Sequence, residues 1–100
     1  MPKTIYVSIG NTDDKLRQAE WAAFVSAVNA VVSGFHLYGE WYSRPDSWVQ
    51  NACWCLELPD ESQSLQETIL RAALVDIARS YRQDSIAWAE AQVEFLSPSD

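Results

Sequence analysis

Residues 35–58 read FHLYGEWYSRPDSWVQNACWCLEL, and this stretch decides the fold that the sequence predicts. Apolar and polar residues alternate on both sides of residues 44–47, RPDS, a turn-forming segment, and this is the pattern of a β-hairpin with strands over 35–43 and 48–58. The alternation assigns the residues of the two strands to opposite faces. One face takes Phe35, Leu37, Gly39, Trp41, Ala52, Trp54, Leu56 and Leu58; the other takes His36, Tyr38, Glu40, Tyr42, Asn51, Cys53, Cys55 and Glu57.

A strand and a helix are expected before the hairpin. Residues 4–10, TIYVSIG, alternate with Ile5, Val7 and Ile9 on one face. Residues 11–14, NTDD, offer capping side chains for a helix that begins near residue 16 and ends at Gly34. The apolar positions of that helix recur every three or four residues, as in a helix packed on a sheet: Trp21, Phe24, Val25, Val28, Val31 and Val32.

A second helix and a fourth strand are expected after the hairpin. Ser64 and Glu67 have the spacing of a capping box, and Arg79 and Arg82 suit a helix carboxyl end. Residues 86–96, IAWAEAQVEFL, alternate strictly and favour a strand, with a helix as the alternative because Ala and Glu favour one. The apolar stripe expected for the second helix is Leu65, Ile69, Ala73, Ile77 and Tyr81, flanked by Leu70 and Leu74.

The order of these elements is βαββαβ. Right-handed crossovers then place both helices on one face of a four-stranded antiparallel sheet, so the sequence predicts an α+β ferredoxin-like plait. A chain of 100 residues is too short for two independent cores, and we expect a single domain over 1–100. One face of the sheet is left uncovered.

The uncovered face is expected to bind a partner. If the apolar series face the helices, Tyr and Trp rings stand among acids and amides on this face, and such rings give large contact area at low entropic cost. We expect a homodimer or higher oligomer that buries part of Tyr38, Tyr42 and Trp88. The residues expected there are Tyr6, Ser8, His36, Tyr38, Glu40, Tyr42, Asn51, Cys53, Cys55, Glu57, Trp88, Glu90, Gln92 and Glu94.

Charge and hydropathy exclude several partners. Seven Lys and Arg against fourteen Asp and Glu give a net charge of −7, which repels nucleic acid and anionic membranes. The chain carries no apolar run typical of a signal peptide or a membrane span, so we expect a cytoplasmic protein without direct nucleic-acid or membrane binding.

Signals for catalysis, cofactors and metals are weak. Cys53 and Cys55 are expected to be reduced and structural, and with His36 they give at most three zinc ligands. The catalytic candidates are a pair of one cysteine with His36 and a carboxylate pair of Glu40 with Glu90. No glycine-rich phosphate loop is present. We therefore expect no enzyme, no cofactor and no metal site.

Arginines define a second binding hypothesis. Arg79 and Arg82 at the helix end, with Arg44 in the hairpin turn, hold three of the seven positive charges. The ordinary interpretation is a solvated helix end whose arginines complement the helix dipole. The alternative is an anion clamp that meets the phosphate of a nucleotide-like ligand while its ring stacks on Trp88 or Tyr42.

Three segments carry a resemblance to a known group: residues 8–16, SIGNTDDKL, residues 48–58, WVQNACWCLEL, and residues 81–91, YRQDSIAWAEA. They resemble small uncharacterised acidic proteins of actinobacteria and their phages. The resemblance implies a phage or mobile-element setting, in which small acidic proteins often inhibit host defence. The expected function is a non-enzymatic counter-defence inhibitor that binds a host protein. The alternatives are sequestration of a small nucleotide-like signal and a small accessory enzyme.

Overall fold

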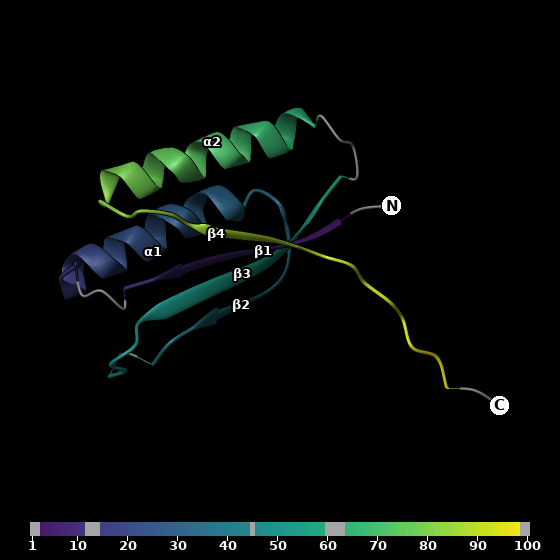
Figure 1. The fold of residues 1–100 in the computed structure, drawn as a ribbon, viewed down its shortest axis with the longest axis horizontal. Helices are drawn as coiled ribbons and strands as arrows, with labels where there is room; N and C mark the ends of the chain where they lie inside the picture. Colours follow the sequence, from purple (N-terminus) through teal and green to yellow (C-terminus); the bar gives the residue numbers. More distant parts are fainter. Residues whose placement is uncertain (1–2, 12–14, 45, 60–63, 99–100) are drawn as a thin grey trace.

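The computed structural model describes residues 3–11, 15–44, 46–59 and 64–98. The chain runs β1 (Lys3–Gly10), α1 (Gln18–Val32), β2 (His36–Tyr42), β3 (Asn51–Leu58), α2 (Leu65–Ser80) and β4 (Ala87–Ala91). The four strands form one sheet in the order β2-β3-β1-β4, and every neighbouring pair is antiparallel. Both helices lie on one side of this sheet (Figure 1). The predicted ferredoxin-like plait is confirmed.

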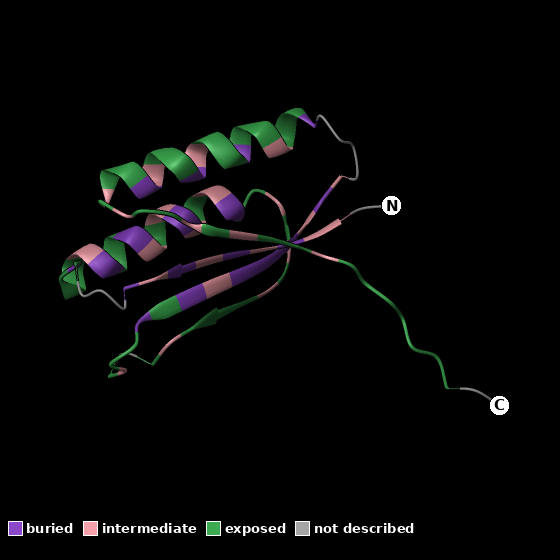
Figure 2. Ribbon diagram, in the orientation of Figure 1, coloured by how far each residue is buried: buried purple, intermediate pink, exposed green. Residues whose placement is uncertain are grey.

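The core lies between the helices and the two central strands. Ile5 and Val7 on β1 and Trp54 on β3 are fully buried, as the alternation predicts, and Phe24 and Val28 of α1 close over them. Figure 2 shows buried positions along the inner strands and along the sides of the helices that face them. Burial of large side chains on one face only leaves the other face of the sheet open. None of the helices in the described ranges is long and apolar enough to cross a membrane.

A buried asparagine connects β1 to the segment before α1. Asn11 Nδ2 donates to the Leu16 carbonyl at 2.9 Å and to Gln50 Oε1 at 2.8 Å, and the Leu16 amide donates to Asn11 Oδ1 at 3.0 Å. The helix begins at Gln18, later than predicted, and the Arg17 amide donates to Glu20 Oε1 at 3.1 Å. The capping role expected of residues 12–14 lies outside the described residues, as do part of the turn at residue 45 and the break at residues 60–63.

Helix α2 has the predicted cap but a different buried stripe. Ser64 Oγ accepts from the Glu67 amide at 3.4 Å, which confirms Ser64 as the N-cap. Leu65 and Ile69, predicted to face the core, are 72% and 59% exposed. The flanking residues Leu70 and Leu74 are buried together with Ala78, while Ile77 and Tyr81 of the predicted stripe pack against the core as expected.

A bulge in β2 reverses part of the predicted face assignment. Leu37 lies opposite Leu56 and Trp41 lies opposite Cys53, with a register shift between Leu37 and Gly39. One extra residue in a strand turns every later side chain to the other face. Trp41 therefore joins the open face, and the prediction that placed Glu40 and Tyr42 there is wrong.

Strand β4 has the opposite phase from the prediction. Trp88 lies opposite Val7 and Glu90 lies opposite Ile5, and both partners point toward the helices. Trp88 and Glu90 were expected on the open face, so that prediction is wrong. The open side of β4 carries the small residues Ala87, Ala89 and Ala91.

The last strand is also shorter than expected. The alternating segment 86–96 forms a strand only over Ala87–Ala91, where β1 can pair with it from Ser8 to Thr4. Residues 92–98 continue as an exposed chain that leads away from the sheet (Figures 1 and 2).

Candidate functional site

The face of the sheet opposite the helices, here called the open face, carries side chains from all four strands. Register assigns all but one of them, because residues directly opposite in an antiparallel pair share a face. Tyr38 is the bulge residue without a register partner, and it reaches this face through its contacts with Glu57 and His36. The side chains are Thr4, Tyr6 and Ser8 from β1, His36, Tyr38 and Trp41 from β2, Asn51, Cys53, Cys55 and Glu57 from β3, and Ala87, Ala89 and Ala91 from β4.

Two aromatic rings lie over the middle of the open face. Tyr6 and Trp41 come from the strands on either side of β3, and their rings stack with centroids 6.4 Å apart and planes at 22°. Cys55, which lies opposite Tyr6, is only 5% exposed despite facing away from the helices. A side-chain hydrogen bond with Cys55 raises the pKa of Tyr6. The rings and the thiol form a preorganised apolar platform.

A second aromatic group lies along β2. The rings of His36 and Tyr38 meet edge to face with centroids 5.2 Å apart. Desolvation and a hydrogen bond with Glu57 raise the pKa of Tyr38. Tyr38 and Trp41 nevertheless remain 56% and 55% exposed, so much of both rings is available to a partner.

His36, Cys53 and Cys55 share the open face, but the structure does not bring the predicted carboxylate pair together. Glu40 and Glu90 lie on β2 and β4, the two edges of the sheet, which are about 14 Å apart at ordinary strand spacing. The carboxylate pair proposed from sequence is therefore wrong. Cys53 and Cys55 are free cysteines, and Ser8 Oγ donates to Cys53 Sγ at 3.2 Å. No group of three metal-ligating side chains occurs within the described ranges.

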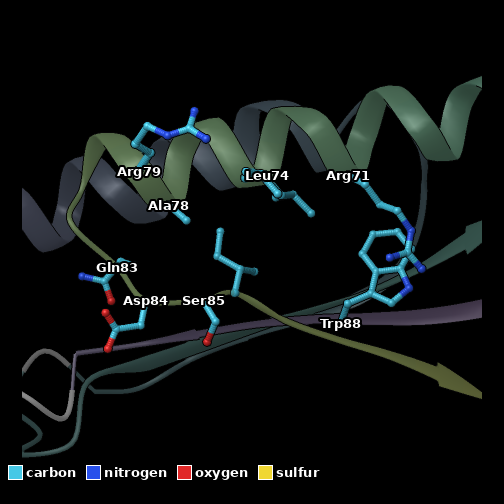
Figure 3. A pocket seen from close by; sticks show the side chains of 10 residues that line it. Arg71, Leu74, Ala78, Arg79, Gln83, Asp84, Ser85 and Trp88 are labelled. Carbon is cyan, nitrogen blue, oxygen red and sulfur yellow. The ribbon is translucent and has the colours of Figure 1, made fainter.

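A groove runs between the second half of α2 and the start of β4. It encloses about 480 Å³ and is largely apolar, with charged side chains along its rim (Figure 3). Figure 3 shows Trp88 under Arg71 at one end, Gln83 and Asp84 at the other, and Arg79 above them. The lining residues are Arg71, Leu74, Val75, Ala78, Arg79, Gln83, Asp84, Ser85, Ile86 and Trp88.

Ion pairs fix the Trp88 end of the groove. The Arg71 guanidinium carbon lies 4.3 Å from the centroid of the Trp88 ring, a cation–π contact. Arg71 also pairs with Glu67 at 3.0 Å and Glu90 at 3.8 Å, and Lys3 pairs with the same two carboxylates at 2.6 and 3.1 Å. Within the part of the chain that the structure describes, Trp88 Nε1 is the one buried side-chain nitrogen or oxygen without a hydrogen-bond partner.

The structure separates the arginines of the predicted anion clamp. Arg79 lines the groove with Trp88, as the hypothesis needs, and also pairs with Asp76 at 2.9 Å. Arg82 turns away and pairs with Glu20 at 2.6 Å. Arg44 lies in the β2–β3 loop, 3.5 Å from Asp46 and at the sheet edge opposite β4. Of the three, Arg79 is the one that lines the groove with Trp88.

Tyr42 makes contacts within the fold, where the sequence predicted contacts with a ligand. Its ring meets Trp54 edge to face at 5.8 Å, and its hydroxyl donates to Asn29 Oδ1 at 3.5 Å. Burial, followed by a hydrogen bond with Glu40, raises the pKa of Tyr42. Of the residues predicted to bind a partner, only Tyr38 lies on the open face.

Sequence reasoning missed Trp41 and Arg71. A glycine inside a strand is a common sign of a bulge, and Gly39 was the available signal for the reversed phase of Trp41. The signal for Arg71 was its spacing of four from Glu67, which places the two side chains together on α2. No family model, no curated protein and no solved structure matches this chain.

Proposed function

We propose that this chain is a non-enzymatic binding protein that holds a partner protein on the open face of its sheet. The observation that supports this most directly is the exposure of Tyr38 and Trp41, each more than half accessible, on a face that no described helix covers. Stacking with Tyr6 fixes the Trp41 ring in place before binding. Large rings that are already ordered lose little entropy on association, which is typical of interface anchors.

The chemistry of the face favours a protein with a basic surface. Aromatic rings stand beside Glu57, and the chain has a net charge of −7, so electrostatic attraction would bring a cationic partner to this surface. RNA-binding sheets of this topology combine stacking rings with Lys and Arg, and the open face carries neither among its described side chains. The resemblance to acidic phage proteins suggests a setting for this proposal, in which the partner is a host protein and the effect is inhibition.

A comparison of two tryptophans tests the proposal. The Trp41→Ser variant should lose the host protein that the immobilised wild-type chain retains, because it removes the central anchor. Trp48→Ser is the matched control, since Trp48 is 99% exposed in the β2–β3 loop and lies outside the sheet. Retention of the same protein by the Trp41→Ser variant, with Tyr38→Ser added, would overturn the proposal.

The groove supports a second candidate function, the sequestration of a small aromatic anion. Arg71 and Arg79 lie on its rim with the Trp88 ring inside, which joins a stacking surface to phosphate-binding groups. Calorimetry with mononucleotides and cyclic dinucleotides tests this candidate. Heat that disappears in Arg79→Ala and persists in Arg44→Ala would establish it, and no heat from any of these ligands would remove it.

A further inference from the structure

The outer edge of β4 is an unused pairing surface. Strand β4 is the last in the sheet order and pairs only with β1, so the backbone groups on its other side have no strand partner among the described residues. Exposed strand edges are templates for pairing with another chain. Only small side chains, Ala87, Ala89 and Ala91, stand on the open side of this edge, so a neighbouring strand can approach closely.

The segment that follows β4 has the composition of a strand without a partner. Residues 92–96, QVEFL, continue the alternation of β4 beyond the point where β1 can pair with it. Val93, Phe95 and Leu96 are 56%, 85% and 86% exposed. Figure 2 shows this exposed chain leading away from the sheet. Three large apolar side chains in solvent on an extended segment indicate a contact with another surface.

The segment is poorly suited to fold back onto its own β4. A return along the same edge needs a tight turn at residues 92–94, and the sequence Gln-Val-Glu there contains none of the residues that favour one: Gly, Asn, Asp, Pro and Ser. A second copy of the chain needs no turn, because its own residues 92–96 can lie antiparallel along β4 as they stand.

We propose that two copies pair through β4, with residues 92–96 of each lying antiparallel along β4 of the other. Register selects the pairing. If Ala91 lies opposite Ala91 at the twofold axis, then Glu90 lies opposite Gln92 and Trp88 opposite Glu94. A shift of two residues either way sets Glu90 against Glu90 or against Glu94, and like charges directly opposite each other destabilise a sheet.

The chosen register also matches side-chain size. On the open side, Phe95 of one copy lies beside Ala87 of the other, and Val93 lies beside Ala89, so each large side chain meets a small one. On the helix side, Leu96 lies beside Ile86, which lines the groove. The exposed apolar segment and the apolar groove therefore cover one another.

Charge in the groove favours the same arrangement. Glu94 of the second copy comes beside Trp88 and close to Arg71, whose guanidinium lies over the Trp88 ring at the same end of the groove. A carboxylate there can pair with that guanidinium group. The dimer has a continuous sheet with both open faces on one side, and this gives the binding protein two adjacent copies of its contact surface.

A cysteine cross-link tests the register. In a Cys53→Ser/Cys55→Ala background, Ala91→Cys should form a disulfide-linked dimer on mild oxidation, because directly opposed residues have Cα atoms about 5 Å apart. Ala87→Cys is the matched control on the same face of β4, and it stands about 27 Å from its counterpart. Equal cross-linking of the two variants, or none in either, would overturn the register.

Light scattering of the otherwise unmodified chain tests the assembly independently of those cysteines. The wild type should reach twice 11.3 kDa at high micromolar concentration. The N–H groups of the even-numbered residues of β4 face its free edge, because the odd-numbered residues pair with β1, so Gln92→Pro removes a ladder donor and should return the particle to 11.3 kDa. Ser97→Pro, just beyond the paired segment, should leave the dimer intact. A monomeric wild type, or a dimer that survives Gln92→Pro, would contradict pairing through β4.

Discussion

The covered face and the open face of the same sheet use tryptophan in opposite ways. Trp54 on β3 is fully buried and donates its Nε1–H to Asn29 Oδ1 at 3.1 Å. Trp41 on the neighbouring strand β2 is 55% exposed and stacks on a tyrosine that is itself partly exposed. Backbone pairing holds both strands, so the exposed ring is not needed to hold the sheet together. The comparison separates residues that stabilise the fold from residues that are available for contact.

The largest expected effect comes from the covered face. Trp54→Ala should lower the free energy of unfolding by about 3–5 kcal/mol, because it leaves a cavity in the core and removes the hydrogen bond to Asn29. Trp41→Ala should lower it by about 1 kcal/mol or less, since its ring is more than half exposed. Urea unfolding of both variants makes the measurement. Similar losses would mean that the open face belongs to the core.

A medium loss of folding stability is expected from breaking the ion pairs at the edge of the covered face. Hydrogen bonding with Lys3 holds the pKa of Glu67 below its ordinary 4.5, and Glu67 holds the pKa of Lys3 above 10.5. The Glu67 contribution to stability is present above pH 4.5 and is lost as the pH falls through its lowered pKa. The Lys3 contribution is present below pH 10.5 and is lost as the pH rises through its raised pKa.

Glu67→Gln should therefore cost roughly 1 kcal/mol at neutral pH and flatten the acid limb of the stability profile. Asp76→Asn is the control, because its pair with Arg79 is about three-quarters exposed on both sides and should contribute little. Urea unfolding over a pH series measures both. An unchanged acid limb in Glu67→Gln would show that other carboxylates control acid unfolding.

The smallest effect is expected at the end of α2, away from both faces. Arg82 has a φ of 57°, a left-handed backbone, and the following Gln83 amide donates to the Ala78 carbonyl at 2.8 Å, as in a Schellman motif. Arg82→Gly should relieve roughly 1 kcal/mol of backbone strain and lose only the weak, solvent-exposed pair with Glu20. Thermal unfolding should show a slight rise in stability. A clear loss would mean that the ion pair outweighs the strain.

The sequence predicts the central strands well because burial there depends only on local alternation. Ile5, Val7 and Trp54 face the helices in the predicted phase, and Ser64 caps α2 as its spacing with Glu67 indicates. These features, with the order of elements, were sufficient for the fold.

The two edge strands could not be predicted in the same way. In β2, one bulge residue changes the face of everything after Tyr38, and alternation alone does not reveal where a bulge lies. In β4, the apolar series consists of small alanines over the paired region, and the opposite series combines Trp88 with Glu90. Tertiary contacts make the choice: Trp88 packs under Arg71 while the alanines take the open side. The candidate site takes residues from both edge strands and from the central strands. The sequence therefore predicted that the site is aromatic but identified only some of its residues.

The central claim, that the open face holds the partner, can be tested most directly through Cys53. This thiol lies on the open face opposite Trp41 and is partly accessible. In the complex with the retained host protein, alkylation of Cys53 should slow strongly, while the thiol of a Trp48→Cys variant in the β2–β3 loop should react at its free rate. If Cys53 reacts equally fast in the free protein and in the complex, the partner is bound elsewhere and the account is wrong.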